Sequence, residues 1–295
     1  MAEPPDPTHS LFEAHPRTFE SNRYVYPVLS RRAGGISVGV NLNRDKTCNF
    51  DCVYCQVDRA TPRSPQPIEP EPIELDRLAD ELEHTVELVT SGEIFEGPKF
   101  SQAPQSLRRL NDIALSGDGE PTICSNFAKV VATCDEIRRR CCPQHVKLVL
   151  ITNASMLHRQ EVRRGLEILD AANGEIWAKL DAGTEPYYRQ IARSNVPFRQ
   201  ILDNLAGAAA ARPIVIQSLF VRMHGQPVAP AELDAYCRRL EEILSAGGRI
   251  KLVQIHTVAR APAEHWVSAL ADAEVDVIAD QVHRRTGLPV AGFHG

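Results

Sequence analysis

The strongest constraint on the fold is a repeated alternation of short apolar strands with amphipathic helices. Apolar residues alternating with small or polar ones predict the strands, and apolar residues at helical spacing predict the helices between them. Strand and helix alternate six times, which predicts a parallel α/β sheet. Because crossovers between parallel strands are right-handed, we expect a partial (β/α)6 TIM-like barrel. The predicted strands are 36–41, 112–116, 146–151, 175–181, 214–221 and 249–257, and the predicted helices are 73–88, 127–140, 161–169, 201–211, 231–246, 263–271 and 275–285.

Length and composition suit one barrel domain. The chain has 295 residues, of which 43% are hydrophobic, so it can bury one large core. Residues 1–35 begin rich in proline and charge and predict an N-terminal extension that packs on the barrel, which itself covers residues 36–295 with its C-terminal helices. A proline-rich, charged stretch at 61–72 predicts a loop.

Net charge and hydropathy give no indication of a nucleic-acid coat or of a membrane partner. The net charge is -5, which does not suggest a surface generally coated with nucleic acid. The sequence shows no secretory signal and no apolar run long enough to span a bilayer. We therefore expect a cytoplasmic protein with no membrane partner.

Three cysteines carry the clearest chemical signal. Cys48, Cys52 and Cys55 form a Cys-x3-Cys-x2-Cys run directly after the first predicted barrel strand. Thiolate is the ligand that iron–sulfur clusters favour, and three thiolates leave one iron of a four-iron cluster open for another chelator. An open iron is expected of a catalyst, and its position at the C-terminal end of a strand is where barrels place active sites.

Zinc binding and simple burial are the alternatives for the cysteines. Zinc normally takes four ligands, often as two spaced pairs, and no second Cys-x2-Cys exists in this chain. Cytosolic cysteines stay reduced, so the other five are most simply free thiols that are buried or half-buried. A second cluster is the alternative for Cys124, Cys134 and either Cys141 or Cys142.

The triad resembles the signature of the radical S-adenosylmethionine (SAM) superfamily. The full pattern there is Cys-x3-Cys-x-aromatic-Cys, and Tyr54 fills the aromatic position. The resemblance implies a [4Fe-4S] cluster held by the three cysteines, whose open iron binds the amino and carboxylate groups of SAM. It also implies reductive cleavage of SAM to methionine and a 5'-deoxyadenosyl radical, which takes a hydrogen atom from the substrate.

Several strings resemble a group within the superfamily that contains wyosine-synthase-type iron–sulfur oxidoreductases. These strings are 53–58, 116–122, 177–184 and 253–262. Known members of that group modify a guanosine in transfer RNA. This chain departs from them because it has no evident second cysteine triad, no fused flavin domain and no strongly basic surface. The resemblance therefore implies the fold and the SAM chemistry and leaves the substrate open.

The resemblance and the predicted strand ends together suggest a SAM site. Gly119, Glu120 and Pro121 follow the second strand and resemble a Gly-Gly-Glu segment that holds the amino group of SAM, with Asp118 in place of the first glycine. Thr152 and Asn153 end the third strand, where they could bind SAM; the alternative is that Asn153 or Ser155 simply caps a turn. Val258, after the sixth strand, is placed to meet adenine through its backbone.

Strand positions supply the candidate catalytic residues. Lys179 and Asp181 alternate with apolar residues, so we expect them in the lumen, paired with each other or with SAM. His256 shares a strand face with Gln254 and either touches substrate or is a satisfied core histidine. Weaker candidates are Lys46, beside the cysteines, and Arg222, which either clamps an anionic substrate or is solvated.

The sequence thus predicts a radical SAM enzyme acting on a small molecule or an RNA base, with a small molecule favoured over tRNA. The alternatives are an activating or maturation enzyme for a protein partner, wyosine-type tRNA modification, and a non-catalytic metal-binding protein. An enzyme of this kind needs an electron donor such as flavodoxin or ferredoxin.

Overall fold

The structure is a computed structural model that describes residues 17–30, 32–57 and 72–295. The start of the predicted extension and almost all of the predicted loop at 61–72 lie outside these residues. The chain divides into two compact units. The first contains residues 1–45, 70–150 and 160–175, and the second contains residues 46–69, 151–159 and 176–295.

The first unit is built on strands that pair in the order β1-β2-β3-β4. β1 (Val25–Ser30) is antiparallel to β2 (Gly35–Val40), whereas β2, β3 (Leu110–Leu115) and β4 (Lys147–Thr152) are parallel. Every residue of β2 is buried, as expected of a parallel strand covered on both faces. The sequence predicted no strand within the N-terminal extension, which contains β1.

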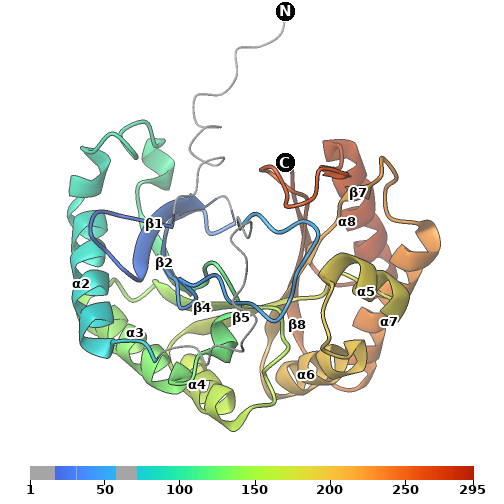
Figure 1. The fold of residues 1–295 in the computed structure, drawn as a ribbon, viewed down its shortest axis with the longest axis horizontal. Helices are drawn as coiled ribbons and strands as arrows, with labels where there is room; N and C mark the ends of the chain where they lie inside the picture. The colour runs from blue at the N-terminus through green and yellow to red at the C-terminus, as the bar shows by residue number, and fades with distance from the viewer. Residues whose placement is uncertain (1–16, 31, 58–71) are drawn as a thin grey trace, which may run out of the picture. The chain divides into compact units, whose positions relative to one another are not determined.

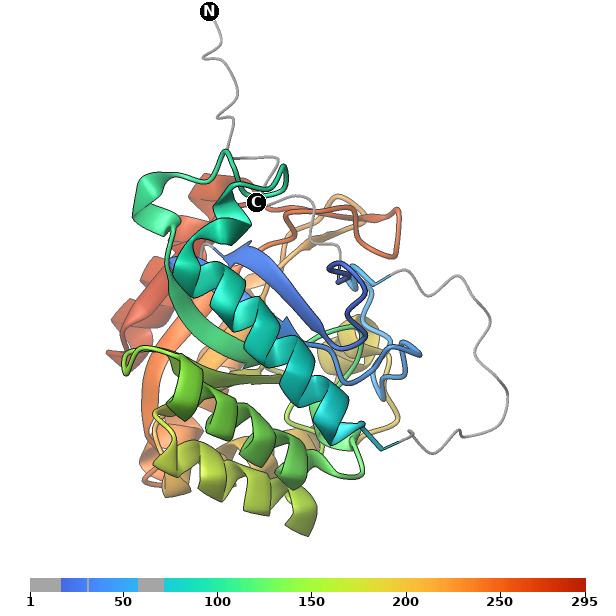
Figure 2. The ribbon, with the colours of Figure 1, turned by 90° about the vertical axis from the view of Figure 1, so that its left-hand side faces the viewer.

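Three helices of the first unit lie side by side along its strands, as Figure 2 shows. They are α2 (Leu75–Ser91), α3 (Phe127–Cys141) and α4 (Gln160–Ala171). Gly165 of α4 allows close packing, since a Cβ there would lie 2.6 Å from the ring of Phe127 on α3. Short 3-10 turns, η1 (Glu93–Phe95), η2 (Gln105–Leu107) and η3 (Pro121–Ile123), complete this unit.

The second unit contains four parallel strands in the order β5-β6-β8-β10. Their bounds are Gly174–Lys179, Ile214–Leu219, Ile250–His256 and Val290–Phe293. Its helices are α5 (Glu185–Ala192), α6 (Phe198–Ala211), α7 (Pro230–Ser245) and α8 (Asp272–Thr286), of which α6 and α7 lie beside each other in Figure 1. Gly247 follows α7 with φ of 82°, which matches the predicted end of that helix.

The predicted alternation of strands and helices is confirmed, with one error. The helix predicted at 263–271 does not form. There, β9 (Val267–Ser268) pairs with β7 (Arg222–Met223), and the Leu270 amide donates to the Thr257 hydroxyl at 2.9 Å. These tertiary bonds satisfy the backbone in place of helical ones. The sequence pattern also left α5 and β10 unassigned.

Among the described residues, no helix combines the length and the apolar character needed to cross a membrane.

Candidate functional site

The three predicted cluster ligands lie on one irregular loop of the second unit, residues 46–57, which we call the cysteine loop. Cys48, Cys52 and Cys55 are half-buried, and none of them forms a disulfide. The Cys55 amide donates to the carbonyl of Cys52 at 2.9 Å, which folds the second half of the motif into a tight turn. The loop therefore offers three cysteines from eight consecutive residues.

The remaining cysteines differ in their surroundings. Cys124, Cys134 and Cys237 are buried, and Cys141 and Cys142 are half-buried. The prediction that these five cysteines are buried or half-buried is confirmed. Burial raises the pKa of Cys134 to about 12, as expected of an inert core thiol.

The cysteine loop is anchored to the C-terminal end of α5. The amides of Asp51 and Val53 each donate at 3.0 Å to the carbonyls of Ala192 and Ile191. The last carbonyls of a helix have no partner within the helix, so they are natural acceptors for a neighbouring segment. Arg193, the residue after the helix, has φ of 45° and donates from Nε to the Asp51 carbonyl at 2.8 Å. Its Nη1 also pairs with Glu264 at 2.6 Å.

A second anchor runs through the amide of Asn49. Its Nδ2 donates to Ser155 Oγ at 2.7 Å, and its Oδ1 accepts from Asn153 Nδ2 at 2.8 Å. Ser194 Oγ donates to the Asn49 carbonyl at 2.8 Å. The residue after the first cysteine is thus held both by the turn after β4 and by the segment after α5.

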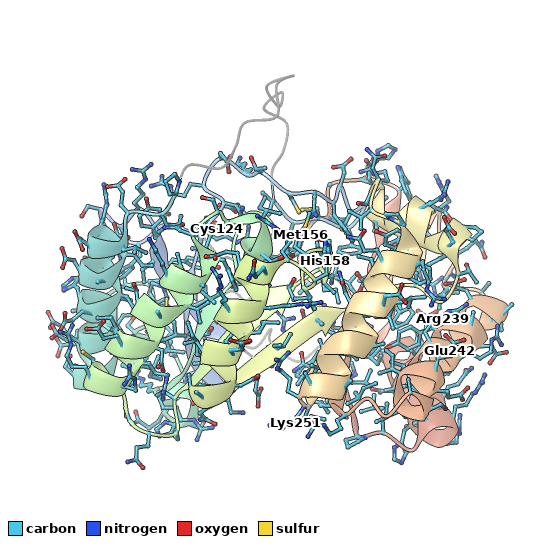
Figure 3. The ribbon with its side chains drawn as sticks, turned by 90° about the horizontal axis from the view of Figure 1, so that it is seen from below. Cys124, Met156, His158, Arg239, Glu242 and Lys251 are labelled. Atoms are coloured by element: carbon cyan, nitrogen blue, oxygen red, sulfur yellow. The ribbon has the colours of Figure 1, made fainter. Side chains whose placement is uncertain are left out.

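The turn after β4 is itself fixed by α6. Ala154 has φ of 64°, an unusual backbone conformation for alanine, and Asn204 Nδ2 donates to its carbonyl at 2.7 Å. The same Nδ2 lies 3.3 Å from His158 Nδ1, and His158 is labelled in this turn in Figure 3. Thr152 Oγ1 accepts from the Ala154 amide at 3.0 Å. Asn153 Oδ1 accepts from the Ser155 amide at 3.0 Å, which is the capping role that the sequence leaves open for Asn153 beside SAM binding.

Tyr54, Lys179 and Asp181 form a third anchor, which we call the tyrosine clamp. The Tyr54 hydroxyl donates to Asp181 Oδ2, and Lys179 Nζ lies 3.4 Å from the same oxygen. Lys179 Nζ also lies 5.0 Å from the centre of the Tyr54 ring, within the range of a cation–π contact. The other oxygen of Asp181 accepts from the Leu219 amide at 2.8 Å. The predicted pairing of Lys179 with Asp181 is confirmed.

The clamp sets the electrostatics of the loop. Burial and then the charge of Asp181 raise the pKa of the Tyr54 hydroxyl well above its usual range, so the hydroxyl remains a proton donor. Burial, followed by the same carboxylate, raises the pKa of Cys52 to about 12. Binding of iron at Cys52 therefore has to displace a proton.

Gly119, Glu120 and Pro121 belong to the first unit. Glu120 is buried, and its Oε1 accepts from the Thr122 amide at 3.1 Å and from the Thr122 hydroxyl. Just before it, Asp118 accepts from Asn41 Nδ2 at 2.6 Å and from Arg17. Asp118, which departs from the expected glycine, therefore fixes this turn.

The remaining candidates lie at the ends of β6 and β8. His256 is half-buried and Val258 is buried, and the His256 carbonyl accepts from the Phe220 amide at 2.9 Å. Gln254 Oε1 accepts from Gln217 Nε2 at 3.0 Å, which joins the two buried amides. Arg222, which the sequence offers as an anion clamp or as a solvated residue, pairs with Glu274 at 2.6 Å.

The sequence pattern did not identify Asn49, Arg193 and Ser194 as supports of the cysteine loop. A usable signal for α5 exists at its start, where Thr184 caps the helix and accepts from the Tyr187 amide, with a proline in the first turn. Neither Arg193 nor Ser194 carries a signal of its own, because their role depends on which segment packs against the helix end.

The donor chemistry of the loop fits an iron–sulfur cluster. Three half-buried cysteines supply soft ligands, and the backbone between them is fixed by bonds to α5. Among the described residues, no group of three or more His, Cys, Asp or Glu side chains is arranged to hold a single metal ion.

Comparisons with known proteins agree with the motif. The family model described as the radical SAM superfamily matches residues 43–232. A protein named GTPase Obg from Brachyspira hyodysenteriae is 24% identical over 262 residues, covering 87% of this chain and 33% of that protein. A UPF0026 protein of Methanocaldococcus jannaschii is 27% identical over 167 residues, covering 57% and 43% of the two chains.

A UPF0026 protein of Synechocystis is 27% identical over 184 residues, covering 61% of this chain and 57% of that protein. This chain thus spans between 33% and 57% of the length of these relatives. The crystal structure of archaeal TYW1 has a TM-score of 0.45 and 11% identity, and the match covers 86% of this chain and 73% of that one.

The matched range contains the cysteine loop, the turn after β3, the turn after β4 and the tyrosine clamp. The predicted fold class, an α/β partial barrel of the radical SAM type, is confirmed with it. The chain belongs to the radical SAM superfamily.

Proposed function

We propose that this chain is a radical SAM enzyme that binds a [4Fe-4S] cluster through Cys48, Cys52 and Cys55. The observation that supports this is the set of three half-buried cysteines on one anchored loop. Three thiolates serve three corners of a four-iron cluster and leave the fourth iron for the amino and carboxylate groups of SAM.

The bound cluster and SAM would supply one-electron cleavage of a sulfonium carbon–sulfur bond, yielding methionine and a 5'-deoxyadenosyl radical that abstracts hydrogen from substrate. The chain's own residues bind and orient these groups and keep water away. For SAM we propose the backbone and carboxylate of 119–121, the polar groups of Thr152 and Asn153, and the backbone of Val258.

The contacts of the tyrosine clamp refine the catalytic assignments. Both oxygens of Asp181 are engaged, by the Leu219 amide on one side and by Tyr54 and Lys179 on the other. This supports a role for Asp181 in positioning Tyr54 and, through it, the cysteine loop. Lys179 and His256 remain our candidates for direct contact with SAM or substrate.

For the substrate we propose a chemical class. We favour a small molecule over an RNA base, with hydrogen abstraction from a protein partner and wyosine-type tRNA modification as alternatives. The net charge of -5 favours the small molecule over a polyanion. Reduction requires an electron donor, for which flavodoxin and ferredoxin are the candidate classes.

Anaerobic reconstitution tests the proposal. The wild-type protein should take up about four irons, show a cluster signal in electron paramagnetic resonance that changes when SAM is added, and cleave SAM under dithionite. Cys48→Ala, Cys52→Ala and Cys55→Ala should each abolish cleavage. Cys141→Ala, which changes a half-buried cysteine outside the loop, is the matched control and should retain activity. A tetrahedral zinc centre without a SAM-responsive iron signal, or full turnover by any loop variant, would reject the proposal.

A further inference from the structure

Asn43 is a buried amide without hydrogen-bond partners. The residue follows β2 in the sequence and precedes the cysteine loop, and it is 1% exposed. Neither Nδ2 nor Oδ1 has a partner in the structure. Buried polar side chains are almost always paired, because an unpaired one gives up its bonds to water without replacement. An unpaired amide of this kind therefore points to a role outside the folded core.

The side chains of Asn41 and Asp118 bond to each other and to the backbone, and neither bonds to the side chain of Asn43. Asn41 Oδ1 accepts from the backbone amides of Asn43 and Asp118, each at 3.1 Å. Asn41 Nδ2 donates to Asp118 Oδ2 at 2.6 Å, and the other oxygen of Asp118 accepts from Arg17. These bonds fix the backbone of Asn43 while leaving its side chain unpaired.

The same contacts tie Asn43 to the turn after β3. A Cβ on Gly117 would lie 2.2 Å from Asn41 Oδ1, so only glycine allows this close approach. Asn41 therefore joins the Asn43 backbone to residues 117–118, directly before Glu120. This is the turn for which we propose a role in binding the amino group of SAM, and it belongs to the same unit as Asn43.

We propose that Asn43 binds the aminoacyl end of SAM, an inference that rests on the proposed function. An amide presents two N–H donors and a carbonyl acceptor. The aminoacyl group of SAM offers the complementary set, a carboxylate that accepts and an ammonium that donates. The Asn43 side chain is held unpaired in the ligand-free protein, and ligand binding satisfies it. Because the amide atoms are covered, binding must also displace a covering group.

If Asn43 binds SAM, replacing it should weaken the binding of SAM without lowering the stability of the ligand-free protein. In the ligand-free protein, Asn43→Leu removes an unpaired polar group and keeps the volume filled, so the unfolding midpoint should stay the same or rise. Asn43→Ala leaves a cavity and serves for the binding measurement alone. In the reconstituted protein, the same changes remove a hydrogen-bonding partner of a charged ligand, and the affinity for SAM should fall by about tenfold or more. A structural amide would instead lower the midpoint on removal.

Asn111→Ala is the matched control. Asn111 is an asparagine of the same unit whose amide is paired, donating from Nδ2 to the Ala33 carbonyl. It lies on β3 near the N-terminal end of the strand, away from the turn that follows β3. Its replacement should lower the unfolding midpoint and leave the affinity for SAM unchanged.

Equilibrium binding under anaerobic conditions, with three probes, tests the inference. SAM and S-adenosylhomocysteine carry the aminoacyl end, whereas 5'-methylthioadenosine lacks it. The Asn43 variants should bind the first two about tenfold or more weakly and the third unchanged. Three results would overturn the assignment. They are equal losses of affinity for all three probes in the Asn43 variants, an unchanged affinity of these variants for SAM, and an unfolding midpoint of Asn43→Leu that falls as far as that of Asn111→Ala.

The outcome for the wild-type protein separates the two proposals. If the reconstituted wild-type protein does not bind SAM, the proposed function fails and the role of Asn43 fails with it. If the wild-type protein binds SAM and the Asn43 variants bind it equally well, only the role of Asn43 fails.

Discussion

Tyr54 and Asp181 show how a single contact can orient a metal-binding motif. Tyr54 was predicted from the motif alone, as its aromatic residue, whereas its partner depends on β5 and on the segment after it. The alternation along 176–181 correctly placed Lys179 and Asp181 together. It could not predict that their shared target is the Tyr54 side chain, because that pairing depends on the path of the cysteine loop.

We expect Tyr54→Phe to destabilise the cluster-free protein by about 1–3 kcal/mol, because it removes a hydrogen bond to the half-buried carboxylate of Asp181. Urea unfolding of Tyr54→Phe, Asp181→Asn and the double variant measures the coupling between the two side chains. A coupling of about 1 kcal/mol or more is expected. Additivity of the two single changes within about 0.5 kcal/mol would show that the contact does not hold the loop.

Asp112 on β3 gives a prediction about pH. The residue is buried and accepts a hydrogen bond from the Ser37 hydroxyl. Burial raises its pKa from the ordinary 3.8 to about 6. The folded state therefore binds this proton more tightly than the unfolded state. The resulting stabilisation, at most about 3 kcal/mol, is full below pH 3.8 and is lost as the pH rises through 6.

Asp112→Asn should therefore be more stable than the wild-type protein at pH 8, and this advantage should shrink towards pH 4. Denaturant unfolding at a series of pH values measures it. Asp80→Asn removes an exposed carboxylate of α2 and is the control for the loss of a carboxylate outside the core. A difference between Asp112→Asn and the wild-type protein that does not change with pH would contradict the assignment of the raised pKa.

Helices and strands were predictable where the spacing of their own apolar residues determines them. The strands buried on both faces and the long amphipathic helices follow from periodicity, and the predicted ranges overlap the observed ones. β1 escaped assignment because Pro27 lies within it, and proline is tolerated there since β1 stands at the end of the strand order. The helix predicted at 263–271 failed because pairing with β7 outweighed a weak helical pattern.

The end of α5 matters most for the candidate site, and it gives a prediction at the scale of one element. Arg193 has a positive φ, which costs a non-glycine residue roughly 1–2 kcal/mol, and its side chain bonds Asp51 and Glu264. In Arg193→Gly the strain is relieved while the side-chain bonds are lost. We therefore expect global stability to change by less than about 1 kcal/mol.

The cysteine loop should nevertheless loosen in Arg193→Gly. Hydrogen exchange followed by mass spectrometry should show faster exchange at residues 49–55, where the amides of Asp51 and Val53 bond to α5. Arg199→Ala is the control, because Arg199 is an exposed arginine paired with Asp203 on α6. Exchange in the loop that stays at the wild-type rate would show that the helix-end carbonyls suffice without Arg193.

At the scale of the whole molecule, the metal ligands and the fold are separable. The cysteine loop is held by backbone bonds to α5, by the Asn49 amide and by the tyrosine clamp. These contacts use amides, a hydroxyl and a carboxylate. None of these anchoring contacts uses a thiol, and each of the two compact units has buried apolar residues. Small zinc-dependent domains differ, because their metal supplies the folding free energy.

Removal of iron should therefore leave the fold intact. After chelation of the reconstituted protein, we expect an unchanged far-ultraviolet circular dichroism spectrum and cooperative thermal unfolding, with a lower midpoint because bound metal stabilises only the folded state. The triple variant Cys48→Ala, Cys52→Ala, Cys55→Ala should match the chelated protein in both measurements, since it lacks the ligands and keeps the anchors. Loss of cooperative unfolding in either sample would mean that the cluster, and not the contacts of α5, Asn49 and Tyr54, organises the second unit.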